Sequence, residues 1–153
     1  MISSKQIFNI SEEWFKFIHG RNGDGDIYIN PTITDYKEIY KKYPSHQVRF
    51  WVDIKDRKVY VWEISLALHV DVASILGKSN DFRNIYNPNY LLGYAVLKNG
   101  KFVMSGLNKY GMNLKNSQDK KYIQSLLSQD WKWISKYIDM TWFFNTFKSW
   151  ALL

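Results

Sequence analysis

The stretch QVRFWVDIKDRKVYVWEISLALHVDVASILG, residues 47–77, decides the fold class. Before the charged segment 55–58, Val48, Phe50 and Val52 stand at every second position, and after it Val59 and Val61 do the same. This alternation is typical of two antiparallel strands joined by a turn. Phe50 and Val61 share one face of this hairpin, and Trp51, Tyr60 and Trp62 share the other. Because both faces carry large apolar groups, we expect other parts of the chain to cover at least part of each.

A helix is predicted to follow directly, over residues 66–76. Ser65 is a suitable N-cap, and Gly77 stands where a helix commonly ends in the left-handed conformation. At 100° per residue, His69 lies on the apolar side with Val72, and Asp71 points away from it. His69 is therefore predicted to be a buried histidine, hydrogen-bonded within the chain, with membership of a functional site as the alternative.

The segment Val59–Ala73 also resembles a segment of uncharacterised proteins from bacteriophages and prophages. The shared features are the string Val59-Tyr60-Val61-Trp62 and, in the helix, Ala67-Leu68-His69. This chain has Glu63-Ile64 where the similar proteins have Asp-Ala. The resemblance implies an origin in a virus or a mobile element, and it implies no mechanism.

A second hairpin is predicted over Tyr90–Leu97 and Phe102–Leu107. It turns at Asn99-Gly100, the strongest turn signal in the chain, because both positions of such a turn need a positive φ. The polar segment 80–89 before it, which holds Asp81, Arg83, Tyr86 and Pro88, is predicted to be a loop of the kind that often carries function. Two hairpins predict an antiparallel sheet of about four strands covered by helices from both ends of the chain, an α+β fold.

A short helix and a loop are predicted near the amino terminus. Ser11 caps the helix, which ends at Gly20. The following segment, Asn22–Asp26, has the first three oxygen ligands of a calcium loop. Ile27 and Ile33 stand where that loop needs glycine and glutamate, so a turn is predicted instead of a calcium site.

A second short helix is predicted between its cap, Thr34, and Pro44. One side of it holds Tyr36, Ile39, Tyr40 and Tyr43, and the other holds Lys37, Glu38, Lys41 and Lys42. Lysines neutralise phosphates and aromatic rings stack on bases, so Lys37, Lys41 and Lys42 are candidate contacts to nucleic acid. The net charge of +7 suits this partner, although lysines are scattered and no known nucleic-acid-binding motif is present.

The last third of the chain is predicted to be helical, with apolar residues recurring at a spacing of three and four from Ile123 onward. Five aromatic residues then spread around the whole helix: Trp142, Phe143, Phe144, Phe147 and Trp150. One face of a sheet cannot hide all of them, so they are predicted to contact a second copy of the chain or another protein. Packing on the sheet and shallow insertion at a membrane surface are the alternatives.

Composition bounds the remaining possibilities. The 153 residues are expected to form one domain, 1–153, because no linker or low-complexity segment divides them. The chain has no cysteine, which excludes disulfides and favours the host cytoplasm or a virion as its location. No window of about 20 residues is free of charge, so no transmembrane helix is predicted.

No catalytic or metal-binding spacing is recognisable in the chain, and neither a metal nor a cofactor is predicted. Asp53 and Glu63 on adjacent strands are a candidate carboxylate pair, although cross-strand ion pairs are more common there. We therefore expect a non-catalytic binding protein of phage or mobile-element origin, either an accessory or virion-associated component or an inhibitor of a host system. A basic nucleic-acid-binding module is the alternative, and a small hydrolase or nuclease comes third.

Overall fold

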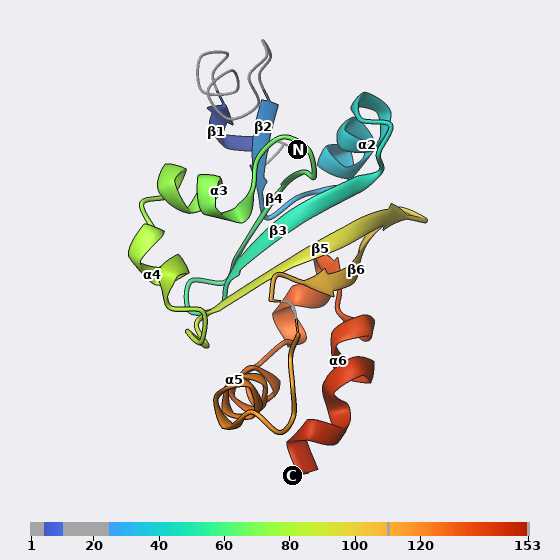
Figure 1. Ribbon diagram of the computed structural model, residues 1–153. Helices are drawn as coiled ribbons and strands as arrows, with labels where there is room; N and C mark the ends of the chain where they lie inside the picture. The colour runs from blue at the N-terminus through green and yellow to red at the C-terminus, as the bar shows by residue number, and fades with distance from the viewer. Residues whose placement is uncertain (1–4, 11–24, 110, 153) are drawn as a thin grey trace.

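The computed structural model describes residues 5–10, 25–109 and 111–152, which form an α+β fold around one sheet (Figure 1). The strand order is β1-β2-β4-β3-β5-β6-β7, and all neighbours are antiparallel except β6 and β7. The strands are β1 (Lys5–Ile10), β2 (Gly25–Ile29), β3 (Gln47–Asp53), β4 (Lys58–Glu63), β5 (Tyr90–Lys98), β6 (Lys101–Leu107) and β7 (Ile138–Asp139). The predicted fold class is confirmed, but the described sheet extends beyond the expected four strands.

Both predicted hairpins are present, and together they form the middle of the sheet. Phe50 pairs with Val61 and Trp51 with Tyr60, as the alternation of residues 48–62 requires. The turn between β5 and β6 has φ of 54° at Asn99 and 79° at Gly100, which confirms the predicted turn.

The helices are α2 (Ile33–Lys42), α3 (His69–Ile75), α4 (Ser79–Arg83), α5 (Ser117–Leu127) and α6 (Thr141–Phe147), with the 3-10 helices η1 (Lys132–Lys136) and η2 (Lys148–Leu152). The helix predicted from Ser11 to Gly20 lies outside the described residues, as does most of the loop Asn22–Asp26. In the described part of that loop, Gly25 and Asp26 belong to strand β2.

Two predicted helix boundaries and one predicted loop need correction. The N-cap of α2 is Thr32 and not Thr34, because the Thr32 hydroxyl accepts a hydrogen bond from Asp35 N at 3.2 Å and Asp35 Oδ2 accepts one from Thr32 N at 2.9 Å. Helix α3 begins at His69, three residues later than expected, because Ser65 donates to the Glu63 side chain instead of capping a helix. Part of the predicted loop 80–89 forms the short helix α4.

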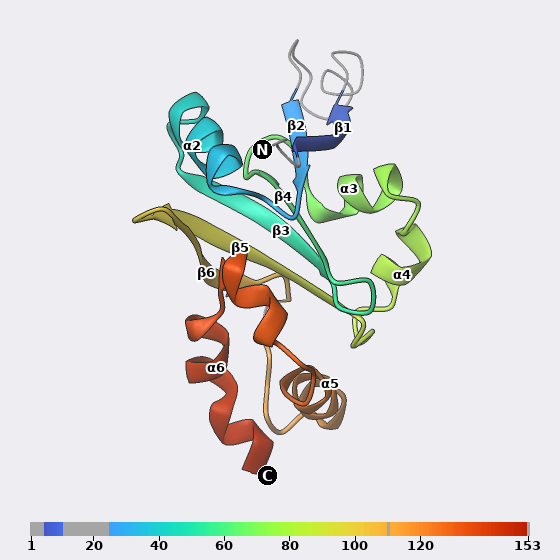
Figure 2. The same ribbon diagram turned by 180° about the vertical axis from the view of Figure 1, so that it is seen from behind.

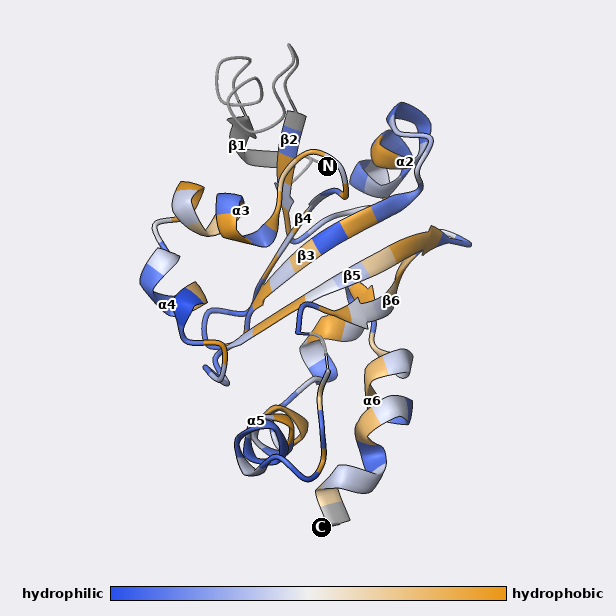
Figure 3. Cartoon of the chain, in the orientation of Figure 1, coloured by the Kyte–Doolittle hydropathy of each residue, from blue (hydrophilic) through white to orange (hydrophobic). Residues whose placement is uncertain are grey.

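The sheet has an apolar core on each face. On the first face, Phe50, Val61 and their neighbours pack against α2, α5, η1 and α6. On the second face, Trp51, Tyr60 and Trp62 are covered by α3 and α4. Both sides of the hairpin are thus covered, as predicted, but α3 and α4 come from the middle of the chain and not from its ends (Figures 1 and 2). Figure 3 shows that apolar and hydrophilic residues alternate along β3.

The C-terminal segment departs from the predicted continuous helix. After α5 the chain forms η1, then strand β7, then α6 and η2. Ile138 pairs with Phe102 in the parallel register of β6 and β7, although its spacing from Ile134 fits a helical repeat. Among the described residues, no helix combines the length and the apolar character needed to span a membrane.

Replacing Gly93 by alanine is expected to lower the free energy of unfolding by about 1–3 kcal/mol, the usual cost of overpacking. An added Cβ at Gly93 would lie 2.6 Å from Phe50 Cζ and 2.7 Å from Gly106 O. Gly106→Ala is the matched control, because its Cβ would meet Tyr94 Cδ2 at an ordinary 3.4 Å. Urea denaturation of both variants measures the difference, and equal losses would show that the contact with Phe50 is not the cause.

Candidate functional site

His69 lies between the sheet and helix α3 and is 2% exposed. Its Nε2 lies 3.0 Å from Phe50 O and 3.1 Å from Gly93 O, so an N–H at this nitrogen donates to two neighbouring strands. Its Nδ1 is buried without a hydrogen-bond partner among the described residues. Burial lowers the pKa of His69 to about 4. These contacts place His69 in the core as a neutral hydrogen-bond donor.

The aromatic residues of the C-terminal segment fall into two groups. Phe143, Phe147 and Trp150 are buried in the first core, which corrects the expectation that they form a surface. Trp142 and Phe144 are only partly buried and remain the members of the set that a partner protein can reach. Phe143, Phe147 and Trp150 are buried within the chain because α6 packs against β6 while η2 packs against α5.

The predicted basic residues of α2 are exposed. Lys37, Lys41 and Lys42 all point into solvent along the outer side of the helix. Tyr40, which the helical pattern places on the same side as Tyr36 and Ile39, is 45% exposed and stacks on His46 with a centroid distance of 3.8 Å. An exposed ring therefore lies among these lysines.

The candidate carboxylate pair of Asp53 and Glu63 does not form. Asp53 is paired in the sheet register with Lys58, whereas Glu63 is paired with Val48 at the other end of the same hairpin. Asp53 binds Lys78 at 3.3 Å, and Glu63 accepts a hydrogen bond from the Ser45 hydroxyl at 2.6 Å. In the described ranges, no group of three or more histidine, aspartate or glutamate side chains is arranged to hold a metal ion.

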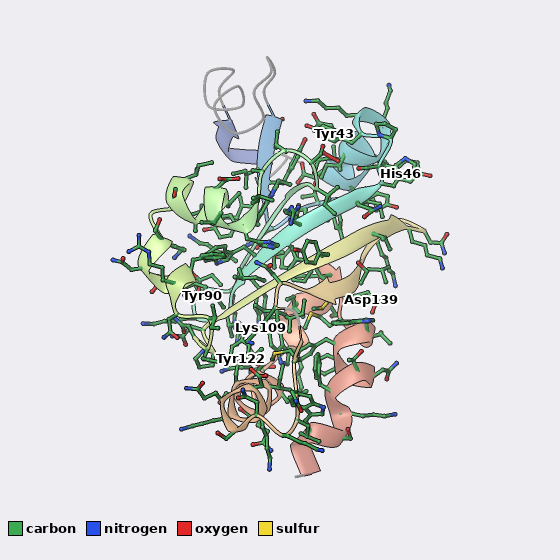
Figure 4. All side chains as sticks on the ribbon, viewed as in Figure 1. Tyr43, His46, Tyr90, Lys109, Tyr122 and Asp139 are labelled. Carbon is green, nitrogen blue, oxygen red and sulfur yellow. The ribbon has the colours of Figure 1, made fainter. Side chains whose placement is uncertain are left out.

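A hollow on the described surface lies where β3, β5 and α4 meet, and sequence reasoning missed it. We call it the Tyr90 pocket; it measures about 470 Å³ including its open mouth. Its lining comprises Trp51, Asp81, Phe82, Asn84, Ile85, Asn87, Tyr90, Leu92, Leu107, Asn108, Lys109 and Tyr122. Figure 4 labels Tyr90, Lys109 and Tyr122, which reach this region from β5, the loop after β6 and α5.

The floor of the Tyr90 pocket is aromatic. The Trp51 ring packs edge-on against Tyr90 at 5.5 Å and lies 6.1 Å from Phe82. Trp51 is fully buried, whereas Phe82, Tyr90 and Leu92 keep part of their surface exposed. The Trp51 indole N–H has no hydrogen-bond partner within the described part of the chain. Ligand sites are commonly lined by apolar and aromatic side chains with a few placed polar groups.

A polar network holds Tyr90 in place. The Tyr90 hydroxyl donates to Asp81 Oδ2 at 3.0 Å, and Lys78 Nζ lies 5.3 Å from the centre of the Tyr90 ring. Burial raises the pKa of Tyr90, and the bond to Asp81 raises it further. Burial alone would lower the pKa of Lys78, but Tyr90 and Asp53 raise it overall. At neutral pH, Tyr90 therefore stays a donor and Lys78 a cation.

A second ion pair holds Lys109 at the opposite wall. Lys109 Nζ lies 3.1 Å from Asp119 Oδ1 and 5.3 Å from the centre of the Tyr86 ring. Burial opposes ionisation of Asp119, but the bonds from Asn113 N and Lys109 keep its pKa below the ordinary value. Both ends of the pocket are thus fixed by charged pairs that are already satisfied.

The rim of the pocket offers mainly hydrogen-bond donors. Asn84 Oδ1 accepts from Tyr86 N at 3.3 Å, and Asn87 Oδ1 accepts from Asn89 N at 3.0 Å. These backbone donors fix the orientation of both amides, which leaves each NH₂ group without a partner among the described residues. Asp81 Oδ1 is the complementary acceptor, since only Oδ2 bonds to Tyr90.

The pocket could not be found from spacing, because its lining extends from Trp51 to Tyr122. The available signal was the polar segment 80–89, which supplies much of the lining. No protein-family model, curated protein or solved structure shows a significant match to this chain.

Proposed function

We propose that this chain is a non-catalytic binding protein of bacteriophage or mobile-element origin that works in the host cytoplasm or the virion. The resemblance of Val59–Ala73 to phage proteins supports the origin. The Tyr90 pocket supports the binding role and supplies the site: it takes one large apolar side chain of a partner protein, together with the peptide groups beside that side chain.

The partly exposed apolar floor is the observation that carries this proposal. Phe82, Tyr90 and Leu92 line one hollow, and Ile85 beside them is 55% exposed. Covering apolar surface is worth about 25 cal/mol per Å², and edge-to-face packing on a fixed ring adds to this. A phenylalanine, tryptophan or leucine side chain gains most from such a floor.

The rim indicates a peptide in preference to a simple anion. The NH₂ groups of Asn84 and Asn87 can donate to backbone carbonyl oxygens, and Asp81 Oδ1 can accept from a backbone N–H. A peptide offers both kinds of group next to its side chain, whereas a carboxylate or phosphate ligand would meet the charge of Asp81. Lys109 does not offset that charge freely, because it is paired with Asp119.

Nuclear magnetic resonance titration with N-acetyl-tryptophan amide and N-acetyl-leucine amide tests the site directly. We expect saturable shifts at Phe82, Tyr90 and the Trp51 indole N–H, with N-acetyl-glycine amide producing none. N-acetyl-tryptophan, which carries a free carboxylate, should bind more weakly than the amide because of Asp81. Tighter binding of the free acid would show that the site takes anions and not peptides.

A matched pair of variants links the shifts to the pocket. Ile85 and Leu68 are both aliphatic and similarly exposed, at 55% and 51%, but only Ile85 lines the pocket. Ile85→Asp is expected to weaken binding of the tryptophan amide about tenfold, the effect of roughly 1.4 kcal/mol, and Leu68→Asp to leave it unchanged. Equal effects of both variants, or shifts gathered elsewhere, would contradict the proposal.

A further inference from the structure

The described part of the surface is rich in basic side chains. The buried charged side chains of the described residues are all acidic: Asp26, Asp35, Asp53, Glu63 and Asp119. The lysines and arginines between residues 26 and 151, in contrast, all keep part of their surface in solvent. The cations are therefore available to an anionic partner, while many of the carboxylates are taken up by internal contacts.

One part of this surface is hollowed. Two hollows of about 640 and 660 Å³, open solvent included, lie side by side near the β5–β6 turn, because both are lined by Lys101, Ser135 and Asp139; we call the two together the groove. Ile33 and Tyr36 of helix α2 line the first hollow, and this links the groove to α2. Asp139 is the carboxylate in this groove, and it accepts hydrogen bonds from Thr141 N at 2.9 Å and the Thr141 hydroxyl at 2.6 Å.

Aromatic rings lead from the groove onto α2. Tyr36 is buried, Tyr40 lies 6.0 Å from it with an interplanar angle of 21°, and His46 stacks on Tyr40 at 3.8 Å and 12°. Figure 4 shows His46 at the outer end of β3, beside α2. This stack begins in the core and ends at the surface with Tyr40 45% exposed, so its outer rings are held rigidly in solvent.

Lysines flank the rings along the same path. Lys37 and Lys41 lie on the exposed side of α2 with Tyr40, and neither has a partner among the described residues. In the groove, Lys136 lies 5.2 Å from the centre of the partly exposed Tyr137 ring, and Lys101 is exposed beside it. We call the set Lys37, Tyr40, Lys41, Lys101, Lys136 and Tyr137 the basic track.

We propose that the basic track binds single-stranded nucleic acid, a function beyond the peptide binding assigned to the Tyr90 pocket. The lysines contact successive phosphates, and bases stack on the Tyr137 ring and on the outer end of the Tyr40–His46 stack. Unpaired bases are needed because the faces of paired bases are already stacked in a duplex. The contacts involve backbone charge and ring faces, so the track reads no sequence.

Fluorescence anisotropy with labelled dT12 and rU12 between about 50 and 200 mM salt tests this proposal, since electrostatic binding is strong in the lower part of that range. We expect both to bind and an unlabelled duplex of equal length to compete poorly. The double variant Lys37→Gln/Lys41→Gln should reduce the slope of log Kd against log salt by about 1.4, at roughly 0.7 per lost phosphate contact on a single strand. Tyr40→Leu should weaken binding roughly fivefold to a hundredfold, the usual cost of losing one stacked base.

The double variant Lys115→Gln/Lys121→Gln is the matched control. It removes the same charge from exposed lysines at and before α5, far from α2 in both views of the fold (Figures 1 and 2). It should leave the salt slope nearly unchanged. Equal effects of the two double variants would show that binding depends on the general positive charge of the surface and not on the basic track. The same conclusion would follow if poly-glutamate competed as well as the oligonucleotides and Tyr40→Leu had no effect. Failure of the parent protein to bind either oligonucleotide at 50 mM salt would overturn the proposal outright.

Discussion

Replacing Phe143 by alanine is expected to lower the free energy of unfolding by about 3–5 kcal/mol, the usual cost of a large cavity in a core. Phe143 is fully buried, and its ring lies 6.3 Å from Trp131 and 5.3 Å from Phe147. Alanine would remove the ring that packs α6 against Trp131, the residue before η1, and would leave a cavity in its place. Urea denaturation followed by tryptophan fluorescence and circular dichroism measures the loss.

Trp142→Ala is the control for Phe143→Ala. Trp142 neighbours Phe143 in α6 but is only partly buried, so removing its larger ring should cost less. An equal or greater loss for Trp142 would show that α6 packs on the sheet by a different face.

Deleting residues 144–153 extends the same argument. The deletion removes the buried rings of Phe147 and Trp150, and it also removes Trp150 O, which accepts a hydrogen bond from Gln124 Nε2 at 2.9 Å. The truncated chain is therefore expected not to fold. A truncated chain that stays folded, with a lower assembled mass than the parent by light scattering, would instead support the expectation of an interface formed by this segment.

The local parts of the fold could be predicted from the sequence. The two hairpins follow from alternation and from the turn at Asn99-Gly100, both of which act within a few residues. The inward orientation of His69 follows from its place on α3. For the hairpins the decisive interactions lie close in the chain, and for His69 its position on the helix sets its direction, so in each case a short window contains the information.

Non-local pairing accounts for most of the errors. Ile138 fits a helical repeat, but it pairs with Phe102 of β6, which lies far away in the sequence. The interface assigned to Phe143, Phe147 and Trp150 assumed a single helix facing a single sheet, whereas α5 supplies a second surface within the same chain. A helical repeat shows which apolar residues share one face, but it does not identify the surface that buries them.

The Tyr90 pocket and the basic track show the same limit for sites. The helical pattern places Tyr40 on the same side of α2 as Tyr36 and Ile39, which are buried. Tyr40 itself is 45% exposed and lies beside His46. The pocket unites Trp51 of the first hairpin with Phe82 of α4 and Tyr90 of the second hairpin. A single sequence contains no pattern that links these three positions before the sheet order is known.

Lowering the pH from about 6.5 to about 4 is expected to destabilise this protein by about 3 kcal/mol through His69 alone. Burial lowers the pKa of His69 in the folded chain from 6.5 to about 4. The Nε2–H already donates to Phe50 O and Gly93 O, so a second proton would have to bind the buried Nδ1, which has no acceptor among the described residues. The positive charge of Arg49 opposes that proton as well.

The sign of the effect follows from proton counting. Between pH 6.5 and 4 the unfolded chain holds a proton on His69 that the folded chain does not, so acidification favours unfolding. Below pH 4 both states are protonated at His69, and its contribution no longer changes.

Urea denaturation across this range should show a weaker pH dependence for His69→Gln, which keeps N–H donors but does not titrate. Subtracting the free energies of unfolding of the two proteins at each pH removes the contribution of the carboxylates that both contain. The ring proton shifts of His69 in the parent provide a second measurement, because they should stay those of a neutral imidazole down to about pH 4. A titration of these shifts near pH 6.5 would mean that the ring is open to solvent, and the placement of His69 in the core would then be wrong.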